Sequence, residues 1–140
     1  MELAKHIAGW SKDKSTQVGC VVVGPDREIR TTGYNGLPRG AQDDLPERDE
    51  RPEKYFWYVH SETNSLYNAA RIGVSVKGCT IYCTLLPCIN CASAIVQSGI
   101  IRVVVPPLND GWKNDPNWKE SHKRSIVLFE EVGVDLTLID

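Results

Sequence analysis

The sequence predicts an α/β fold, in which a mixed sheet of five strands carries helices on both faces and so forms three layers. Two strand patterns come first with a short turn between them, and three more follow, each after a segment of helix length. A short turn favours antiparallel pairing, whereas helical crossovers imply parallel, right-handed pairing. The 140 residues are 41% apolar and 24% charged, which suits one globular domain over residues 1–140.

The N-terminal part predicts one helix and one hairpin. Apolar residues at helical spacing run through residues 3–10 and end at a polar run over residues 11–15. Residues 17–23 and 28–33 have strand patterns on either side of a Gly-Pro-Asp turn. We therefore expect these two strands to pair as an antiparallel hairpin.

The segment between the hairpin and the next helix predicts irregular structure. Residues 33–40 contain an Asn-Gly pair, which is typical of a turn. Residues 41–54 are acidic and contain proline, so they predict a solvated surface loop. The four aromatic residues 55–58 could form a stacking platform, but packing beneath the following helix is the preferred interpretation.

The next part alternates helices with buried strands. Residues 61–72 predict a helix that buries Leu66, Ala69 and Ala70 and ends at Gly73. Residues 79–84 alternate as a strand, which turns at Pro87 into a helix that Gly99 stops. Residues 100–105 are continuously apolar, which is typical of a central strand covered on both faces.

The C-terminal part predicts one long helix and a closing strand. Asp115 is the expected N-cap and Pro116 the first helical residue, while Gly133 ends the helix. Residues 134–139 then predict the last strand. The residues expected along the buried side of the helix are Trp118, His122, Phe129 and Val132.

Two short motifs have the spacing of a catalytic zinc site. His60 and Glu62 form His-x-Glu, and Cys88 and Cys91 form Cys-x-x-Cys directly after Pro87. Cysteines three apart at a helix start present both sulfurs on one face, and the helix dipole favours thiolates. We therefore expect His60, Cys88 and Cys91 to hold Zn²⁺ and to leave a fourth position for water. Glu62 is then free to move protons, and it is the expected catalytic residue.

A structural zinc site in a non-catalytic domain is the alternative from a different class. Such a site needs a fourth protein ligand, and Cys83 and His122 are the plausible donors. A structural site has no use for a glutamate two residues after a ligand histidine, so the catalytic interpretation is preferred.

Composition and charge limit the partners. A net charge of −2 and a pI near 5.9 argue against nucleic acid, because affinity for a polyanion comes from clustered Lys and Arg. No stretch approaches a membrane span and no export signal is present, so we expect a cytoplasmic protein with a small-molecule substrate. Five cysteines, an odd number, favour a metal site over a disulfide framework, with Cys20, Cys79 and Cys83 buried in the core.

The motifs taken together resemble the deoxycytidylate (dCMP) deaminase family of the cytidine deaminase-like superfamily. The resemblance rests on His60-Ser61-Glu62, on Leu86 to Cys91, on Gly33-Tyr34-Asn35-Gly36 and on the run from Ser11 to Gly19. It implies the three-layer cytidine deaminase-like fold and the zinc-dependent hydrolysis of dCMP to dUMP and ammonia. Deamination of another small nucleoside or nucleobase is the alternative within this class.

The resemblance also implies roles for individual residues. Asn35 matches an asparagine that contacts the nucleoside, and Asn64 matches the asparagine two residues after the catalytic glutamate. Ser61, also expected beside the substrate, stands where the family usually has alanine. Lys14 and Arg39, with Lys12 and Ser15, are the nearest donors for a 5′-phosphate. The family resemblance further suggests a homo-oligomer.

Overall fold

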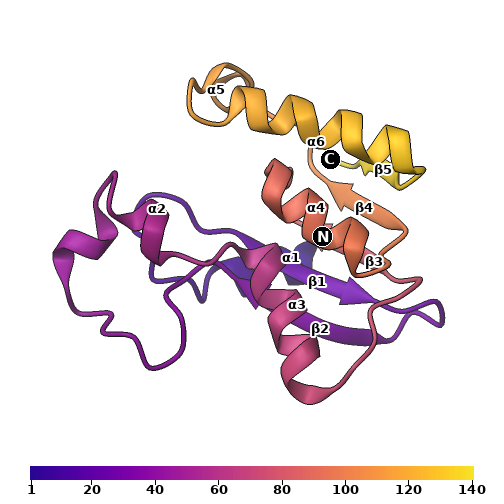
Figure 1. The fold of residues 1–140 in the computed structure, drawn as a ribbon, viewed down its shortest axis with the longest axis horizontal. Coiled ribbons are helices and arrows are strands. Elements are labelled where there is room, and N and C mark those ends of the chain that lie inside the picture. Colours follow the sequence, from indigo (N-terminus) through magenta and orange to yellow (C-terminus); the bar gives the residue numbers. More distant parts are fainter.

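The five strands form one mixed sheet in the computed structural model, which describes all 140 residues (Figure 1). The strands are β1 (Gly19–Val23), β2 (Ile29–Tyr34), β3 (Thr80–Cys83), β4 (Arg102–Val105) and β5 (Asp135–Leu138), in the order β2-β1-β3-β4-β5. β1 is antiparallel to β2 and β3, whereas β3, β4 and β5 are parallel. The predicted hairpin and the mixed five-stranded sheet are confirmed.

Helices cover both faces of the sheet, but unequally. The helices are α1 (Glu2–Ala8), α2 (Lys54–Trp57), α3 (Ser61–Ile72), α4 (Ile89–Gln97), α5 (Asp110–Asn114) and α6 (Lys119–Val132). α3, α4 and α6 contribute to the main core with Cys20 and Val22 of β1, whereas Val21 packs on α1 from the other face. The parallel strands β3, β4 and β5 follow one another across the sheet in one direction. Right-handed crossovers therefore put the connecting helices α4 and α6 on the same face, where they pack together (Figure 1).

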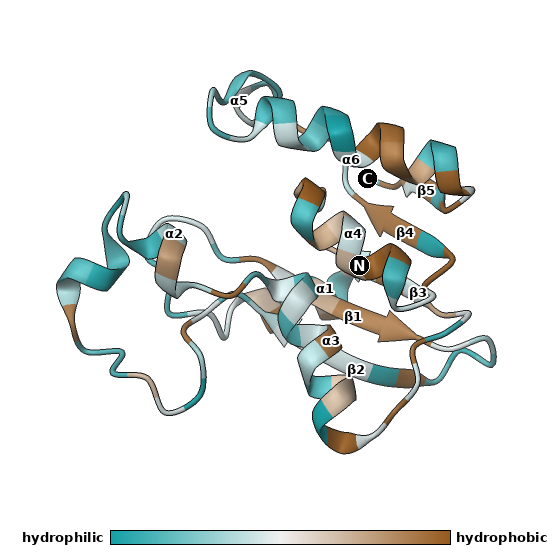
Figure 2. Ribbon diagram, in the orientation of Figure 1, coloured by the Kyte–Doolittle hydropathy of each residue, from teal (hydrophilic) through white to brown (hydrophobic).

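The core lies between the sheet and these three helices. Figure 2 shows apolar β1 and β4 in the middle of the molecule and a polar segment before α2. All five cysteines are free and buried, as expected for a chain without a disulfide framework. No helix has the length and apolar character that a membrane crossing requires.

A glycine sets the distance between the sheet and α3. A Cβ atom on Gly33 of β2 would lie 2.3 Å from the Ser61 carbonyl oxygen and 2.4 Å from the Ser65 nitrogen. No larger residue fits such a gap, so the backbone of β2 touches the first turn of α3. This contact fixes the helix start that carries His60 and Glu62.

The last helix starts later than predicted. α6 begins at Lys119, and a separate short helix, α5, precedes it with Asn109 as its N-cap. Asp115 has an extended backbone, its side chain accepts from the N–H of Asn117 at 2.8 Å, and its carbonyl accepts from the N–H of Lys119 at 2.9 Å. Asp115 therefore makes the contacts of an N-cap, but for the turn of residues 116–118 that leads into α6. Val132 was misplaced, because it is 47% exposed.

Packing of the aromatic run 55–58 beneath α3 was the interpretation preferred from the sequence, and it is wrong. The run forms α2 and the residue after it, and Phe56 is 80% exposed. Tyr55 and Tyr58, three residues apart, face a cavity together, while Trp57 lies under the guanidinium of Arg48. On α3 itself Ala70 is exposed, although Ala69 is buried as predicted.

Candidate active site and metal centre

The three predicted zinc ligands converge at one point. The donor atoms of His60, Cys88 and Cys91 lie within 4.8 Å of one another, and each Sγ is 3.5 Å from His60 Nδ1. Tetrahedral bonds of about 2.3 Å to sulfur and about 2.05 Å to nitrogen would separate these donors by about 3.6 Å. The donor set therefore fits zinc in both its chemistry and its spacing.

Each ligand stands at the start of a helix. His60 is the N-cap of α3 and Cys88 the N-cap of α4, with Cys91 in the first turn. The neighbouring Cys91 thiol and the His60 imidazole lower the pKa of the Cys88 thiol well below its ordinary value. A thiolate is the form that binds a metal, and unpaired N–H groups at the helix start favour it further.

Glu62 lies in the first turn of α3, next to the ligands, and is only 4% exposed. Burial raises the pKa of its carboxyl group, while the His60 imidazole acts in the opposite direction. A buried carboxyl group whose pKa is raised takes up a proton more readily than an exposed one, which suits a general acid and base.

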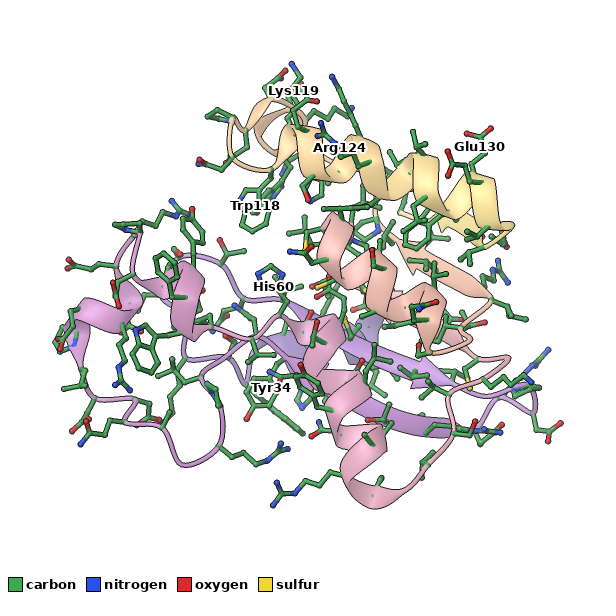
Figure 3. All side chains as sticks on the ribbon, in the orientation of Figure 1. Tyr34, His60, Trp118, Lys119, Arg124 and Glu130 are labelled. Carbon is green, nitrogen blue, oxygen red and sulfur yellow. The ribbon has the colours of Figure 1, made fainter.

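A cavity opens over this group. One side, the inner wall, consists of His60, Ser61, Glu62 and Cys88, and the side facing it, the outer wall, consists of Lys54, Tyr55, Trp112 and Trp118. Figure 3 shows Trp118 at the start of α6 directed toward His60. The two rings are 5.6 Å apart between centroids, and Tyr55 meets Trp118 edge-on at 6.0 Å.

Only part of the predicted substrate-binding set lies at this cavity. Asn35 and Ser61 line it. Asn64 does not, because its amide donates to the Tyr34 carbonyl and ties α3 to the end of β2. Lys14 and Arg39 line a second, more polar hollow, where Lys14 is 3.6 Å from Asp49 and Arg39 donates to Asn68. A role of these residues in substrate binding stays a prediction.

The sequence did not point to a buried ion pair behind Asn35. Lys54 Nζ lies 2.6 Å from Asp13 Oδ2 and donates to the Ser15 hydroxyl at 2.7 Å, and Lys54 is 7% exposed. Asp13 also accepts from the Asn35 amide at 3.2 Å. In the sequence Lys54 ends a run of charged residues, which gave no signal that it was buried.

The structural-zinc alternative lacks its fourth ligand. The group of potential metal donors holds His60, Cys88 and Cys91, and neither Cys83 nor His122 joins it. The ring of His122 instead stacks against Trp118, at 6.4 Å between centroids. Three protein donors leave one position for water, as in catalytic zinc sites.

A mixed five-stranded sheet with His-x-Glu and Cys-x-x-Cys at the starts of two adjacent helices defines the zinc-dependent deaminases. The family model for the cytidine and deoxycytidylate deaminase zinc-binding region matches residues 1–106, and the chain belongs to this family. The zinc-dependent deaminase recognised from the sequence motifs is thereby confirmed.

Similar proteins span most of the chain. This chain is 38% identical over 136 residues to a protein of Aliivibrio fischeri named "Uncharacterized deaminase in luxG 3′region". The match covers 97% of this chain and 88% of the relative. The chain is 41% identical over 139 residues to the deoxycytidylate deaminase of Mus musculus, covering 96% and 74% of the two chains. The dCMP deaminase of cyanophage S-TIM5, solved in complex with dCMP and dUMP, superposes with a TM-score of 0.78 at 24% identity, over 99% of this chain and 92% of that one. At that identity the likeness concerns the fold.

Proposed function

We propose that the protein hydrolyses dCMP to dUMP and ammonia. The observation that carries this proposal is the buried Glu62 carboxyl group in one cavity with His60 and Cys88, which together with Cys91 form a group of three zinc donors that leaves a fourth position for water. The substrate is inferred from similarity to deoxycytidylate deaminases, of which the mouse protein is 41% identical.

Metal binding and proton transfer are assigned to different residues of the site. His60, Cys88 and Cys91 would hold zinc, which when bound supplies a Lewis acid that activates water for attack on the amino-bearing ring carbon. Glu62 takes the first proton from the water and passes it to the ring nitrogen N3. It then takes the second proton, from the hydroxyl group now on the ring carbon, and delivers it to the leaving amine, so that Glu62 gives up as many protons as it accepts.

The outer wall would hold the nucleotide. Trp118, opposite His60, is placed to cover a flat base, and Asn35 offers a polar contact for the sugar. Lys54 is neutralised by Asp13, whereas Arg51 lines the cavity, is exposed and forms no salt bridge. We therefore add Arg51 to Lys14 and Arg39 as a candidate for the 5′-phosphate.

Further properties follow from the sequence arguments. We infer that residues 1–140 act as one domain, that the protein is cytoplasmic and assembles with copies of itself, and that nucleic acid is not its substrate. The net charge of −2 supports the last point.

Ammonia release from a panel of substrates tests the proposal. The panel holds dCMP, CMP, dCTP, cytidine, adenosine and guanine, each assayed with zinc-loaded protein. We expect the highest kcat/KM with dCMP. Activity on cytidine, adenosine or guanine with none on the nucleotides would contradict the dCMP assignment and leave the deaminase class intact. Arg51→Ala should raise the KM for dCMP and leave that for cytidine unchanged.

A further inference from the structure

A buried row of polar side chains leads from the core to the catalytic carboxyl group. Ser61 Oγ donates to Glu62 Oε2 at 2.9 Å, and it is 3.0 Å from Cys20 Sγ on β1. Cys20 is paired with Cys83 of β3 in the antiparallel register. Ser61, Cys20 and Cys83 are completely buried.

The direction of the hydrogen bonds in this row follows from the number of protons. A hydroxyl group has one hydrogen, and that of Ser61 goes to the Glu62 carboxylate. The contact between Ser61 and Cys20 therefore needs the thiol as donor. Burial raises the pKa of the Cys20 thiol, so that it keeps its hydrogen. Donors thus point along the row toward Glu62, an arrangement in which each bond strengthens the next.

Glu62 receives no other hydrogen bond from a side chain. The residue is 4% exposed, and the hydroxyl of Ser61 is the one side-chain donor to its carboxylate. A glutamate has three side-chain torsions, so a carboxylate without such a contact can occupy several rotamers. Proton transfer requires a carboxyl oxygen within about 2.6–3.2 Å of the atom that gives or takes the proton.

We propose that Ser61, held by the Cys20 thiol, is a positioning residue that fixes one oxygen of Glu62 and thereby keeps the other available for proton transfer. The inference rests on the proposed function, since it assigns Ser61 a part in the deaminase reaction. Ser61 does not itself touch the reacting atoms; it acts through Glu62. Because the Ser61 hydroxyl is bonded to Glu62, we infer that it does not contact the substrate, contrary to the expectation from the sequence, and the KM should not depend on it.

Two serines of α3 give a matched pair of variants. Ser65 is as deeply buried as Ser61, but its hydroxyl donates to the Glu62 backbone carbonyl at 2.6 Å and not to the carboxylate. We expect Ser61→Ala to lower kcat for dCMP about 10-fold with KM within about twofold of the wild type. Ser65→Ala should leave both constants within about twofold, although it removes the same atom at the same depth.

The thiol supplies a second, independent comparison. Cys20→Ala should lower kcat about threefold, and Cys20→Ser should recover the loss because a hydroxyl group again donates to Ser61. In the Ser61→Ala background, Cys20→Ala should change kcat no further. Additive losses in the double variant would mean that the two residues act separately, and would overturn the role of Cys20.

Crystal structures of the zinc-loaded variants provide a readout besides activity. We expect Glu62 in one rotamer in Ser65→Ala and in more than one in Ser61→Ala. A wild-type kcat in Ser61→Ala, or a single unchanged rotamer of Glu62 there, overturns the proposal. Failure of the proposed function looks different, because the wild type would then release no ammonia from dCMP while the rotamer comparison could still be made.

Discussion

The inner and outer walls of the cavity are built in different ways. The inner wall consists of the first turns of α3 and of the N-cap of α4, so its residues lie within short motifs on regular elements. The outer wall gathers Lys54 and Tyr55 from the short helix α2, and Trp112 and Trp118 from the α5–α6 region. Catalytic groups are thus held by local structure, whereas the groups expected to select the substrate depend on contacts between distant segments.

The strongest test of the inner wall is the substitution Glu62→Gln. Glutamine has the same shape but cannot accept and return a proton, so we expect kcat for dCMP to fall about 10³-fold or more. Zinc content, measured by elemental analysis, should stay at one ion per chain because the three donors are unchanged. A variant that keeps its zinc and works within tenfold of the wild type would remove Glu62 from the mechanism.

The inner wall could be predicted from the sequence because its geometry is local. Glu62 follows His60 by two positions and Cys91 follows Cys88 by three, and at the start of a helix these spacings place the side chains close together. The alternation of strands and helices then brought the two motifs together through right-handed crossovers. The antiparallel hairpin and the buried faces of β3 and β4 followed from the turn signals and from the periodicity of apolar residues.

The outer wall could not be predicted, because it depends on tertiary contacts. Whether Lys54 is exposed or buried is decided by Asp13, 41 positions away along the chain. Trp118 was placed correctly on the side of the last helix that faces inward, but the start of that helix was misjudged. Ser61 was noticed as a departure from the family, yet its contact with Cys20 links α3 to β1 and has no signature in the sequence.

The buried ion pair should matter most for the stability of the outer wall. Lys54→Met removes the cation and leaves Asp13, which is only 6% exposed, with an unpaired charge. We expect this change to lower the free energy of unfolding by about 3–5 kcal/mol. Urea denaturation of zinc-saturated protein measures the loss. Lys12→Met is the matched control, since Lys12 pairs with Asp43 at the surface and its side chain is 76% exposed. Equal effects of the two substitutions would show that burial of the Lys54 pair is unimportant.

Trp118 should affect binding more than chemistry. Its ring lies opposite His60 at 5.6 Å, and loss of a base-stacking contact costs about 1–2 kcal/mol. We therefore expect Trp118→Ala to raise the KM for dCMP about 10-fold and to change kcat less, with Trp118→Phe in between. Trp57→Ala serves as the control, because Trp57 lies on the neighbouring helix outside the cavity. A fall in kcat at constant KM would show that Trp118 acts in the chemical step and not in substrate binding.

The pH dependence of stability should separate the ion pair from the metal site. Burial alone would raise the pKa of Asp13, but hydrogen bonds from Lys54, from the backbone of Ser15 and Thr16 and from the Ser15 hydroxyl hold it below its ordinary value. Because the folded pKa is the lower one, this contribution to stability is complete above the unfolded pKa of about 3.9 and is lost as the pH falls below it.

Lys54→Met removes the hydrogen bond from Lys54 to Asp13, so less opposes the rise in the Asp13 pKa that burial causes. Protonation of Asp13 in this variant then removes an unpaired buried charge. The difference in unfolding free energy between wild type and Lys54→Met should therefore be largest at neutral pH and narrow below about pH 4. Acid also releases zinc, but both proteins carry the same ligands, so that effect cancels in the difference. If the difference in unfolding free energy stays constant from pH 7 to pH 3, Lys54 stabilises the fold by packing of its side chain and not by its charge.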